Sequence, residues 1–358
     1  MRPSKAIIDL AALQANLDFA AGLSPNAKNV AVIKANAYGH GMVEAALALQ
    51  FRTEALAVAT IDEALILRAA GVEGPLLVLQ GASTVADVEE AAANSLWLML
   101  HEPGQLELLQ KAGGSDPVTV WLKIDTGMHR LGFSPGQAVT ALESLTTLAR
   151  VVQPPVLCTH LACADMLQSP VTQQQLSTFS AFAQGKGLPR SIANSAGIMH
   201  WPDSHAAWNR PGIMLYGCDP TGGFGDDQPG LTPVMTVVSE ILAIRDLSAG
   251  ESVGYGHRWT AQTPSRIGTI SLGYGDGYPR HAPSGTPVLV NGRRVPLAGT
   301  VSMDMITVDL TGHEDVRVGD PVEAWGKNLP VNEVAKYAGT IGYELLAGMT
   351  SRLPRVFI

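Results

Sequence analysis

The sequence is poor in cysteine and in basic residues, and both shortages exclude classes of function. Its 358 residues include only three cysteines, Cys158, Cys163 and Cys218. Three cysteines cannot all pair within one chain, and their spacing is not that of a metal site, so we expect reduced thiols and no bound metal. The 24 Lys and Arg against 32 Asp and Glu give a formal net charge of -8, without a dense basic cluster. We therefore expect neither nucleic acid nor an anionic membrane surface as a partner.

Long apolar runs are also missing. No segment approaches the apolar length that spans a membrane. The N-terminal segment MRPSKAIIDLAALQANLDFA begins with basic residues, but Asp9 and Asp18 interrupt its apolar stretch, which is unlike a signal peptide. No internal repeat or low-complexity linker is present. We expect a soluble cytoplasmic protein, long enough for two domains with sizeable cores.

Between residues 28 and 217, apolar runs typical of strands alternate with segments of helical spacing. The eight runs are KNVAVIK, ALAVA, PLLVLQ, LWLML, PVTVWLKID, PVLCTHLA, SIANS and IMLYG. Repeated β-then-α units predict a parallel sheet, and eight of them predict a closed (β/α)8 barrel of the TIM type. The alternative is an open doubly wound sheet, but no G-x-G-x-x-G turn follows the first run.

The clearest helical segment, TIDEALILRAAG, follows the second run. Thr60 and Glu63 are spaced as a capping box, and Gly71 stands where the helix is expected to end. From about residue 231 the pattern becomes β-rich, and Asn291-Gly292 between two apolar runs predicts a two-residue hairpin turn. We therefore predict a barrel domain over residues 1–230, followed by a mostly β domain over residues 231–358. Residues before about 10 are available to pair with the second domain.

Residues with useful chemistry fall at the ends of the predicted strands, where barrel enzymes carry their active sites. They are Lys34 after the first run, Lys123 in the fifth, His160 in the sixth, Asn194 and Ser195 in the seventh, and Arg210, Gly212 and Ile213 at the entry to the eighth. A chance scatter of polar residues would not favour strand ends so consistently. This placement predicts a functional site at the carboxyl end of the barrel strands.

Lys34 allows two interpretations. A lysine at a strand end is usually a solvated edge residue, because its ammonium is costly to bury. The segment after it, ANAYGHG, is however polar, aromatic and glycine-rich, which is typical of a binding loop. A partly desolvated lysine has a lowered pKa, and its neutral amine can form a Schiff base with an aldehyde such as pyridoxal phosphate (PLP). PLP also needs a phosphate cradle, for which Ser195 and the amides around Gly212 and Ile213 are suited, although NSAG alone is more often a plain turn.

Several motifs then occur in a characteristic order along essentially the whole chain. They are AVIKANAYGHG, LKIDTGMHRLGF, THLACAD, IANSAG, RPGIMLYG, VGYGHRW, SLGYGDGYPR, VSMDMITVDL and GYELL. With these motifs the sequence resembles the alanine racemase family. The resemblance implies a PLP-dependent isomerase with a barrel domain and a β-rich C-terminal domain.

The resemblance also implies roles for individual residues. Lys34 would hold PLP covalently and act as one of two proton-transfer bases, and Tyr255 of the partner subunit would be the other. Arg210 would face the pyridine nitrogen. The full set implied for cofactor binding is Lys34, Tyr38, His160, Asn194, Ser195, Arg210, Gly212, Ile213 and Tyr343. Without the resemblance, Tyr255 in its glycine-flanked segment would be read as packing against a turn.

A second group of residues is implied for the substrate. Arg130 and the backbone amide of Met303 would receive the substrate carboxylate. Lys123 resembles a lysine that many members carry as a carbamate beside that arginine, although it could also form a simple ion pair with Asp125. Ser191 stands where some members have histidine, so the support of Arg210 is expected to differ.

These observations favour a homodimeric alanine racemase that shares its active sites between subunits. A broad-specificity amino-acid racemase on the same scaffold is the nearest alternative. A non-catalytic PLP carrier is a second alternative, but such carriers lack the β domain. A PLP decarboxylase is disfavoured by Arg210, because decarboxylation profits from an acidic partner that keeps the pyridine protonated.

Overall fold

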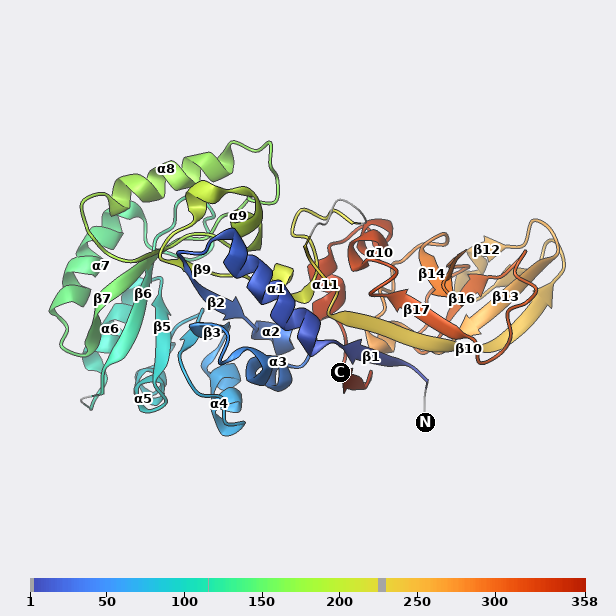
Figure 1. Cartoon of the computed structure of the whole chain (residues 1–358), viewed down its shortest axis with the longest axis horizontal. Helices are drawn as coiled ribbons and strands as arrows, with labels where there is room; N and C mark the ends of the chain where they lie inside the picture. Colours follow the sequence, from blue (N-terminus) through green and yellow to red (C-terminus); the bar gives the residue numbers. More distant parts are fainter. Residues whose placement is uncertain (1–2, 115, 225–229) are drawn as a thin grey trace. The chain divides into compact units, whose positions relative to one another are not determined.

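The computed structural model describes residues 3–114, 116–224 and 230–358 (Figure 1). The chain forms two compact units. One, the barrel unit, comprises Leu17–Ala37 and Met42–Leu215. The other, the β unit, comprises Met1–Asn16, Tyr38–Gly41 and Tyr216–Ile358. The predicted ranges of 1–230 and 231–358 stay a prediction.

Eight parallel strands close the barrel in sequence order, and the last strand pairs with the first. They are β2 (Lys28–Val32), β3 (Ala55–Val58), β4 (Leu76–Val78), β5 (Leu96–Leu100), β6 (Val118–Lys123), β7 (Val151–Cys158), β8 (Arg190–Ser191) and β9 (Trp208–Asn209). The predicted (β/α)8 barrel is confirmed.

The eighth predicted run is wrong as a strand. Ile213–Tyr216 forms the short 3-10 helix η2, and β9 is the eighth strand. All four residues of η2 are buried, and a short, fully buried apolar run does not reveal by periodicity whether it is a strand or a helix. Arg210 consequently lies at the carboxyl end of the eighth strand and not at its entry.

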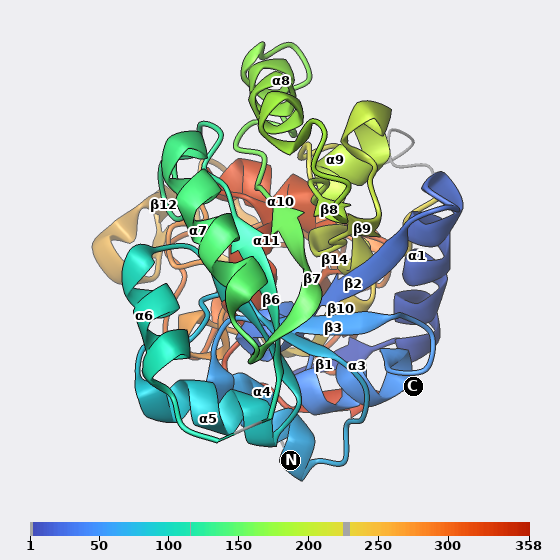
Figure 2. The same cartoon turned by 90° about the vertical axis from the view of Figure 1, so that its left-hand side faces the viewer.

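Helices surround the strands on the outside, as the view along the barrel shows (Figure 2). They are α3 (Met42–Leu49), α4 (Ile61–Ala69), α5 (Val85–Ala93), α6 (Pro103–Lys111), α7 (Pro135–Thr147), α8 (Val171–Ala183), α9 (Ser195–His200) and η1 (Pro202–Ser204). Two further helices, α1 (Leu10–Leu23) and α2 (Lys34–Tyr38), flank β2 in the sequence. None of the helices that the described residues form has the length and apolar character needed to cross a membrane.

Three tryptophans pack together in the barrel, near the amino ends of the strands. The ring centre of Trp208 lies 5.6 Å from those of both Trp97 and Trp121. Lys28 places its ammonium 5.1 Å above the Trp208 ring. Because Lys28 and Trp208 are the first residues of β2 and β9, this cluster helps to fill the amino end of the barrel. The polar residues of interest belong to the opposite end.

The β unit is built on an eight-stranded sheet. The order is β15-β14-β17-β10-β1-β18, and β13 pairs with β10 and β16. The strands are β1 (Lys5–Ile8), β10 (Met235–Leu247), β13 (Ser265–Ile270), β14 (Pro287–Val290), β15 (Arg293–Pro296), β16 (Ile306–Asp309), β17 (Pro321–Trp325) and β18 (Arg355–Phe357). Asn291 and Gly292 join β14 to β15 with φ angles of 51° and 72°, which confirms the predicted hairpin turn.

Shorter elements complete the β unit. They are the two-stranded ribbon β11 (Ser252–Val253) and β12 (Trp259–Thr260), the 3-10 helices η4 (Tyr255–His257) and η5 (Tyr274–Asp276), and the helices α10 (Val331–Ala338) and α11 (Gly342–Ala347). The C-terminal part of the chain is thus mostly β, as expected.

Two backbone segments approach closely inside the β unit. The buried side chain of Asn16 donates to the Thr232 carbonyl at 2.8 Å and accepts from the Thr232 amide at 2.9 Å. Gly217, with φ +75°, lies beside the same residue, and a Cβ built on it would come within 2.0 Å of the Thr232 carbonyl oxygen. Glycine is required here both by its backbone angle and by this contact.

Gly217→Ala should destabilise the protein far more than Gly222→Ala. Gly222 has a similar φ of +82° but open space around its Cβ position, so alanine there costs only the left-handed conformation, about 1–2 kcal/mol. Gly217→Ala also displaces Thr232 from Asn16 and should cost more than about 4 kcal/mol. Urea unfolding of both variants measures the difference. Equal losses would show that the Thr232 contact is not tight.

Candidate active site

The backbone after Lys34 has an unusual conformation. Ala35, Asn36, Ala37 and Tyr38 all have left-handed φ angles, between 50° and 54°. Left-handed backbone costs a non-glycine residue about 1–2 kcal/mol, so a run of four requires firm support from its surroundings. The segment drawn as α2 is therefore a strained turn at the carboxyl end of β2.

Hydrogen bonds from two side chains hold this turn. One carboxylate oxygen of Glu63 accepts from the Ala35 amide at 2.7 Å, and the other accepts from the Ala59 amide at 2.7 Å. The side-chain oxygen of Asn36 accepts from the Met42 amide at 2.9 Å, where α3 begins. The predicted capping box is therefore only half formed. Thr60 Oγ1 accepts from the Glu63 amide at 3.4 Å, but the Glu63 carboxylate bonds elsewhere.

The surroundings of Lys34 suit it to react as a neutral amine. Burial lowers its pKa, the positive charge of Arg130 lowers it further, and Glu63 opposes both by raising it. A lowered pKa leaves more of the amine unprotonated near neutral pH, which is the form that attacks a carbonyl. Burial and Arg130 therefore both favour the neutral amine of Lys34.

Arg210 is buried and its orientation is fixed. Only 5% of its surface is exposed. Nη1 donates to Ser191 Oγ at 2.5 Å, and Nη2 donates to the carbonyls of Thr159 at 2.6 Å and Ile192 at 3.2 Å. Nη2 also lies 3.4 Å from His160 Nδ1. Among the described residues Nε donates to no group, and Nη1 makes one bond although it carries two N–H groups, so this fixed guanidinium has N–H groups available to a ligand. Ser191 thus hydrogen-bonds Arg210 at the position where some family members have a histidine.

Positive charge accumulates around His160. Burial, followed by the charges of Arg210, Lys123, Arg130 and Lys34, holds the pKa of His160 well below 6.5, so its imidazole is neutral. Burial also lowers the pKa of Lys123, and both arginines lower it further, whereas Cys158 and Asp125 raise it. Such a cluster of cationic groups favours anionic ligands, for example a phosphate or a carboxylate.

A hydroxyl and two backbone amides meet beside this cluster. The buried Ser195 begins α9, and its Oγ accepts from the amides of Gly212 at 2.9 Å and Met214 at 3.3 Å. Asn194 caps the helix, since its side-chain oxygen accepts from the Gly197 amide at 2.9 Å. Ile213 lies between the two amide donors in the sequence and is buried. Because Ser195 Oγ accepts both of these bonds, its hydroxyl hydrogen is left to donate and is suited to a phosphate oxygen.

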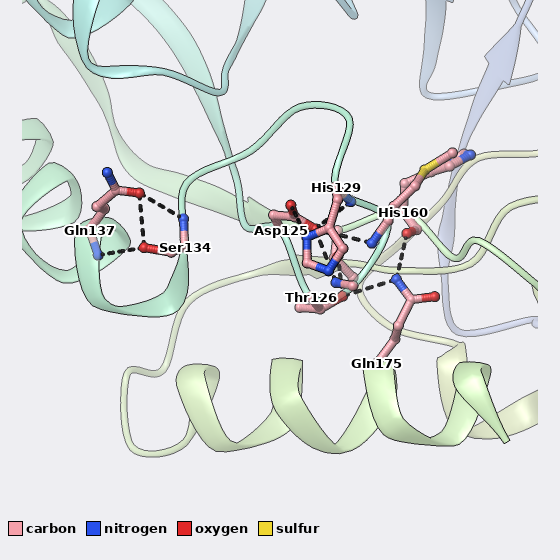
Figure 3. A network of polar contacts seen from close by, with 10 residues as sticks. Asp125, Thr126, His129, Ser134, Gln137, His160 and Gln175 are labelled. Atoms are coloured by element: carbon pink, nitrogen blue, oxygen red, sulfur yellow. Dashed lines mark hydrogen bonds and ion pairs between the residues drawn. The ribbon is translucent and has the colours of Figure 1, made fainter.

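The loop that carries Arg130 is held by Asp125 (Figure 3). Asp125 Oδ1 accepts from the amides of Gly127 at 3.0 Å, Met128 at 3.1 Å and His129 at 3.1 Å. Burial raises the pKa of Asp125, but the bonds from Gly127 and His129 outweigh burial and lower it overall. The turn leaves Arg130 exposed at the mouth of the barrel.

Figure 3 also shows a support that the sequence did not suggest. The buried Gln175 of α8 donates to the His160 carbonyl at 3.0 Å and to Thr126 Oγ1 at 3.3 Å. Thr126 Oγ1 lies 2.8 Å from Thr159 Oγ1. Gln175 therefore ties the loop after β6 to the loop after β7, which positions both Arg130 and His160.

In the β unit, two of the predicted tyrosines come together. The ring centre of Tyr38 lies 4.8 Å from that of Tyr216, in a stacked arrangement, and 6.2 Å from that of Tyr343. Burial raises the pKa of Tyr38 to about 12. Its phenol is therefore protonated at neutral pH and can donate a hydrogen bond to an anion.

Tyr255 and Met303 lie in a second group of the β unit, where large apolar side chains are exposed. The exposed fractions are 72% for Tyr255, 51% for Met303, 43% for Met305 and 38% for Tyr274. Their loops are joined, because Thr300 Oγ1 donates to the Tyr255 carbonyl at 3.0 Å and the Gly275 amide donates to the Met303 carbonyl at 2.9 Å. We call these four residues the exposed loop cluster. Grouped exposed apolar side chains mark interaction surfaces.

Each unit thus gathers part of the predicted set. Coulombic interactions and hydrogen bonds connect Lys34, Lys123, Arg130, His160 and Arg210 at the carboxyl end of the barrel. The β unit brings Tyr38 to Tyr343 and Tyr255 to the loop of Met303. Sequence reasoning missed the supporting role of Glu63 and that of Gln175.

Comparisons with known proteins point to one family. The model of the alanine racemase N-terminal domain matches residues 8–220, and that of the alanine racemase C-terminal domain matches residues 234–357. The alanine racemase of Chromohalobacter salexigens is 46% identical over 354 residues, which are 99% of this chain and 97% of that protein.

Solved structures agree. The biosynthetic alanine racemase from Pseudomonas aeruginosa superposes with a TM-score of 0.97 at 45% identity, and all of both chains is covered. The alanine racemase from Bartonella henselae with covalently bound pyridoxal phosphate superposes with a TM-score of 0.90 at 32% identity, again with all of both chains covered. With both domain models matched and full-length relatives at this identity, the chain belongs to the alanine racemase family of PLP-dependent isomerases.

Proposed function

We propose that the protein interconverts L-alanine and D-alanine by a two-base mechanism that uses PLP, Lys34 and Tyr255 of the partner subunit. The observation that carries this proposal is the meeting of a desolvated lysine with a cluster of cationic groups at the carboxyl end of the barrel strands. Full-length similarity to alanine racemases supports alanine as the substrate.

The available donors fit PLP. Lys34 offers an amine of lowered pKa for the aldehyde, and Arg210 offers N–H groups, Nε–H among them, that its contacts with the described residues leave available. The Ser195 hydroxyl, which the Gly212 amide orients, would hold the phosphate together with the backbone around Gly212 and Ile213 and the phenols of Tyr38 and Tyr343. Asn194 would keep Ser195 in place through its bond to α9. When bound, PLP supplies an electron sink for the pair left on the substrate α-carbon after its proton is removed.

Arg210 favours racemisation over other PLP reactions. A guanidinium stays charged and does not give up its proton, so Arg210 would donate a hydrogen bond to the pyridine nitrogen without protonating it. Its four contacts to Ser191, Thr159, Ile192 and His160 keep it in one orientation. An unprotonated pyridine nitrogen would accept less negative charge, so Arg210 would restrain transamination and would not suit a decarboxylase.

Racemisation needs a proton taken from one face of the α-carbon and a proton returned to the other, so two bases on opposite faces suffice. Lys34 would serve one face. Tyr255 would serve the other from the partner subunit, since a single chain leaves it 72% exposed within the exposed loop cluster. A two-fold dimer that covers this cluster would complete two equivalent sites. Such a dimer, and a cytoplasmic location, stay predictions.

Arg130 and the Met303 amide would bind the substrate carboxylate. Arg130 lies exposed on the loop that Asp125 holds, as a ligand of an incoming anion requires. Lys123 would support it as a carbamate. Carbon dioxide adds to a neutral amine. Burial lowers the pKa of Lys123 and so favours its neutral form. The resulting anion would accept hydrogen bonds from Arg130. A broad-specificity racemase remains the second candidate.

The proposed function is tested by mapping the cofactor and measuring racemisation together. The purified protein should carry PLP, and borohydride reduction followed by peptide mapping should find the label on Lys34. Chiral chromatography should find alanine racemised much faster than serine or lysine. Lys34→Ala should lower kcat/KM at least about 1,000-fold, because it removes a base and the cofactor linkage. Lys111→Ala, at an exposed lysine paired with Glu107, should behave as the unaltered protein.

Two results would contradict this proposal in different ways. Label on Lys123 would overturn the assignment of Lys34. Serine or lysine racemised as fast as alanine would favour the broad-specificity racemase.

Lys123→Ala should raise the KM for alanine more than it lowers kcat, because the carbamate would act by orienting Arg130 toward the substrate carboxylate. Loss of a charge-assisted hydrogen bond of this kind should raise the KM roughly 10-fold or more. Added acetate should restore part of the binding. Intact-mass measurement of the unaltered protein should show one added carbon dioxide. Because acid releases carbon dioxide from a carbamate, the mass is measured from neutral solution containing bicarbonate, and an unmodified mass under those conditions would rule out the carbamate.

A further inference from the structure

Glu63 holds a position that its place in helix α4 does not explain. A glutamate in the first turn of a helix ordinarily accepts a hydrogen bond from the amide of the N-cap residue, here Thr60. The Glu63 carboxylate instead accepts from two other amides. Its oxygens accept from Ala35 and from Ala59, each at 2.7 Å. Ala35 directly follows Lys34, and Ala59 directly follows β3. One carboxylate therefore ties together the carboxyl ends of two neighbouring strands.

The bond to Ala35 acts where the backbone is most strained. Ala35 is the first residue of the left-handed run, with φ 53° and ψ 52°. This bond lies at the peptide directly after Lys34, and the Ala37 amide donates to the Ile33 carbonyl directly before Lys34 at 2.9 Å. It fixes the peptide that joins Lys34 to Ala35, and so it sets the direction in which the Lys34 side chain leaves the backbone.

Two amide donors require a carboxylate. Both oxygens of an ionised carboxylate accept, whereas a glutamine side chain has one accepting oxygen and one donating nitrogen. In a glutamine, the side-chain NH2 group would therefore face the N–H of either Ala35 or Ala59, and that amide would lose its acceptor. An aspartate keeps both acceptors and the charge but is shorter by one methylene, so it reaches the two amides less well.

The negative charge of Glu63 is also unusual in its surroundings. The groups that act electrostatically on Lys34 are Arg130, which lies on the loop after β6, and Glu63. Lys34 in turn acts on His160, together with Arg210, Lys123 and Arg130. Glu63 is the acidic group that opposes the cationic groups at Lys34, although no direct bond between the two side chains is needed for this effect.

We propose that Glu63 is a positioning residue for the cofactor lysine. Its carboxylate fixes the strained turn that aims Lys34, and its negative charge opposes the neighbouring cations. The inference rests on the proposed role of Lys34 and adds to it a residue that touches neither cofactor nor substrate.

The test measures how fast the full-length protein, freed of PLP with hydroxylamine, captures added PLP at a series of pH values. Captured PLP is fixed with borohydride and counted on Lys34 by mass spectrometry. Capture needs the neutral amine, so its rate rises with pH to a plateau, and the midpoint follows the pKa of Lys34. The plateau rate reports how well Lys34 is aimed. Glu63→Gln and Glu63→Asp are compared with Asp62→Asn, a matched control in the same helical turn whose side chain is exposed.

Glu63→Gln should lower the plateau rate roughly 10-fold, as the loss of a hydrogen bond to a charged group predicts. It should also move the midpoint to lower pH, because burial and Arg130 then lower the pKa of Lys34 unopposed. Glu63→Asp should lower the plateau with a midpoint close to that of the unaltered protein, since the charge is kept. Asp62→Asn should change neither value.

A merely structural role for Glu63 gives a different signature. If Glu63→Gln only loosened the barrel, Lys34 would become hydrated and its midpoint would move to higher pH, toward an ordinary lysine. That result, or an unchanged plateau, would overturn the inference. Failure of the unaltered protein to take label on Lys34 would instead overturn the proposed function. The two failures are therefore distinguishable.

Discussion

The left-handed turn that follows Lys34 is the constraint on which the candidate site depends. Four consecutive residues without glycine adopt φ angles of 50–54°, each at a cost of about 1–2 kcal/mol. Summed over the turn, this cost is comparable with the stability of a small domain. Bonds from Glu63 and Asn36 to backbone amides keep the turn in place. Strain of this kind is found where a reactive group must be held in one direction.

Charge imposes a second cost on the same region. Lys34, Lys123, Arg130 and Arg210 act on the one imidazole of His160, and each lowers its pKa. Mutual repulsion among these groups disfavours the cluster in the absence of an anion, so a phosphate and a carboxylate would relieve it. The fixed contacts of Arg210 and the supporting bonds of Gln175 keep the cationic groups from moving apart. The strained turn and the clustered positive charges therefore both lie at the carboxyl end of the barrel strands, where ligands are expected.

The sequence predicted the barrel well because its strands are buried on both faces and read as separate apolar runs. It failed at Ile213–Tyr216, where burial on all sides hides the difference between a strand and a 3-10 helix. Strand-end placement pointed to Lys34 and His160, whereas Arg210 was expected at the entry to the eighth strand and lies at its carboxyl end. It could not identify Glu63, because the bond to Ala35 joins residues 28 positions apart and the local pattern is that of a helix cap. The exposure of Tyr255 was equally hidden, since an aromatic residue between glycines is as often packed as exposed.

The most direct test of the shared site mixes two variants that are each nearly inactive. Lys34→Ala and Tyr255→Phe are dissociated together and allowed to reassociate, and racemisation of alanine is then measured. In a hybrid dimer with shared sites, one site carries both substitutions and the other carries neither. Random pairing makes half of the dimers hybrids, so activity should recover to about a quarter of that of the unaltered protein. If hybrids are shown to form and no activity returns, Lys34 and Tyr255 of one site come from the same chain, and the account of a site completed by the partner subunit is wrong.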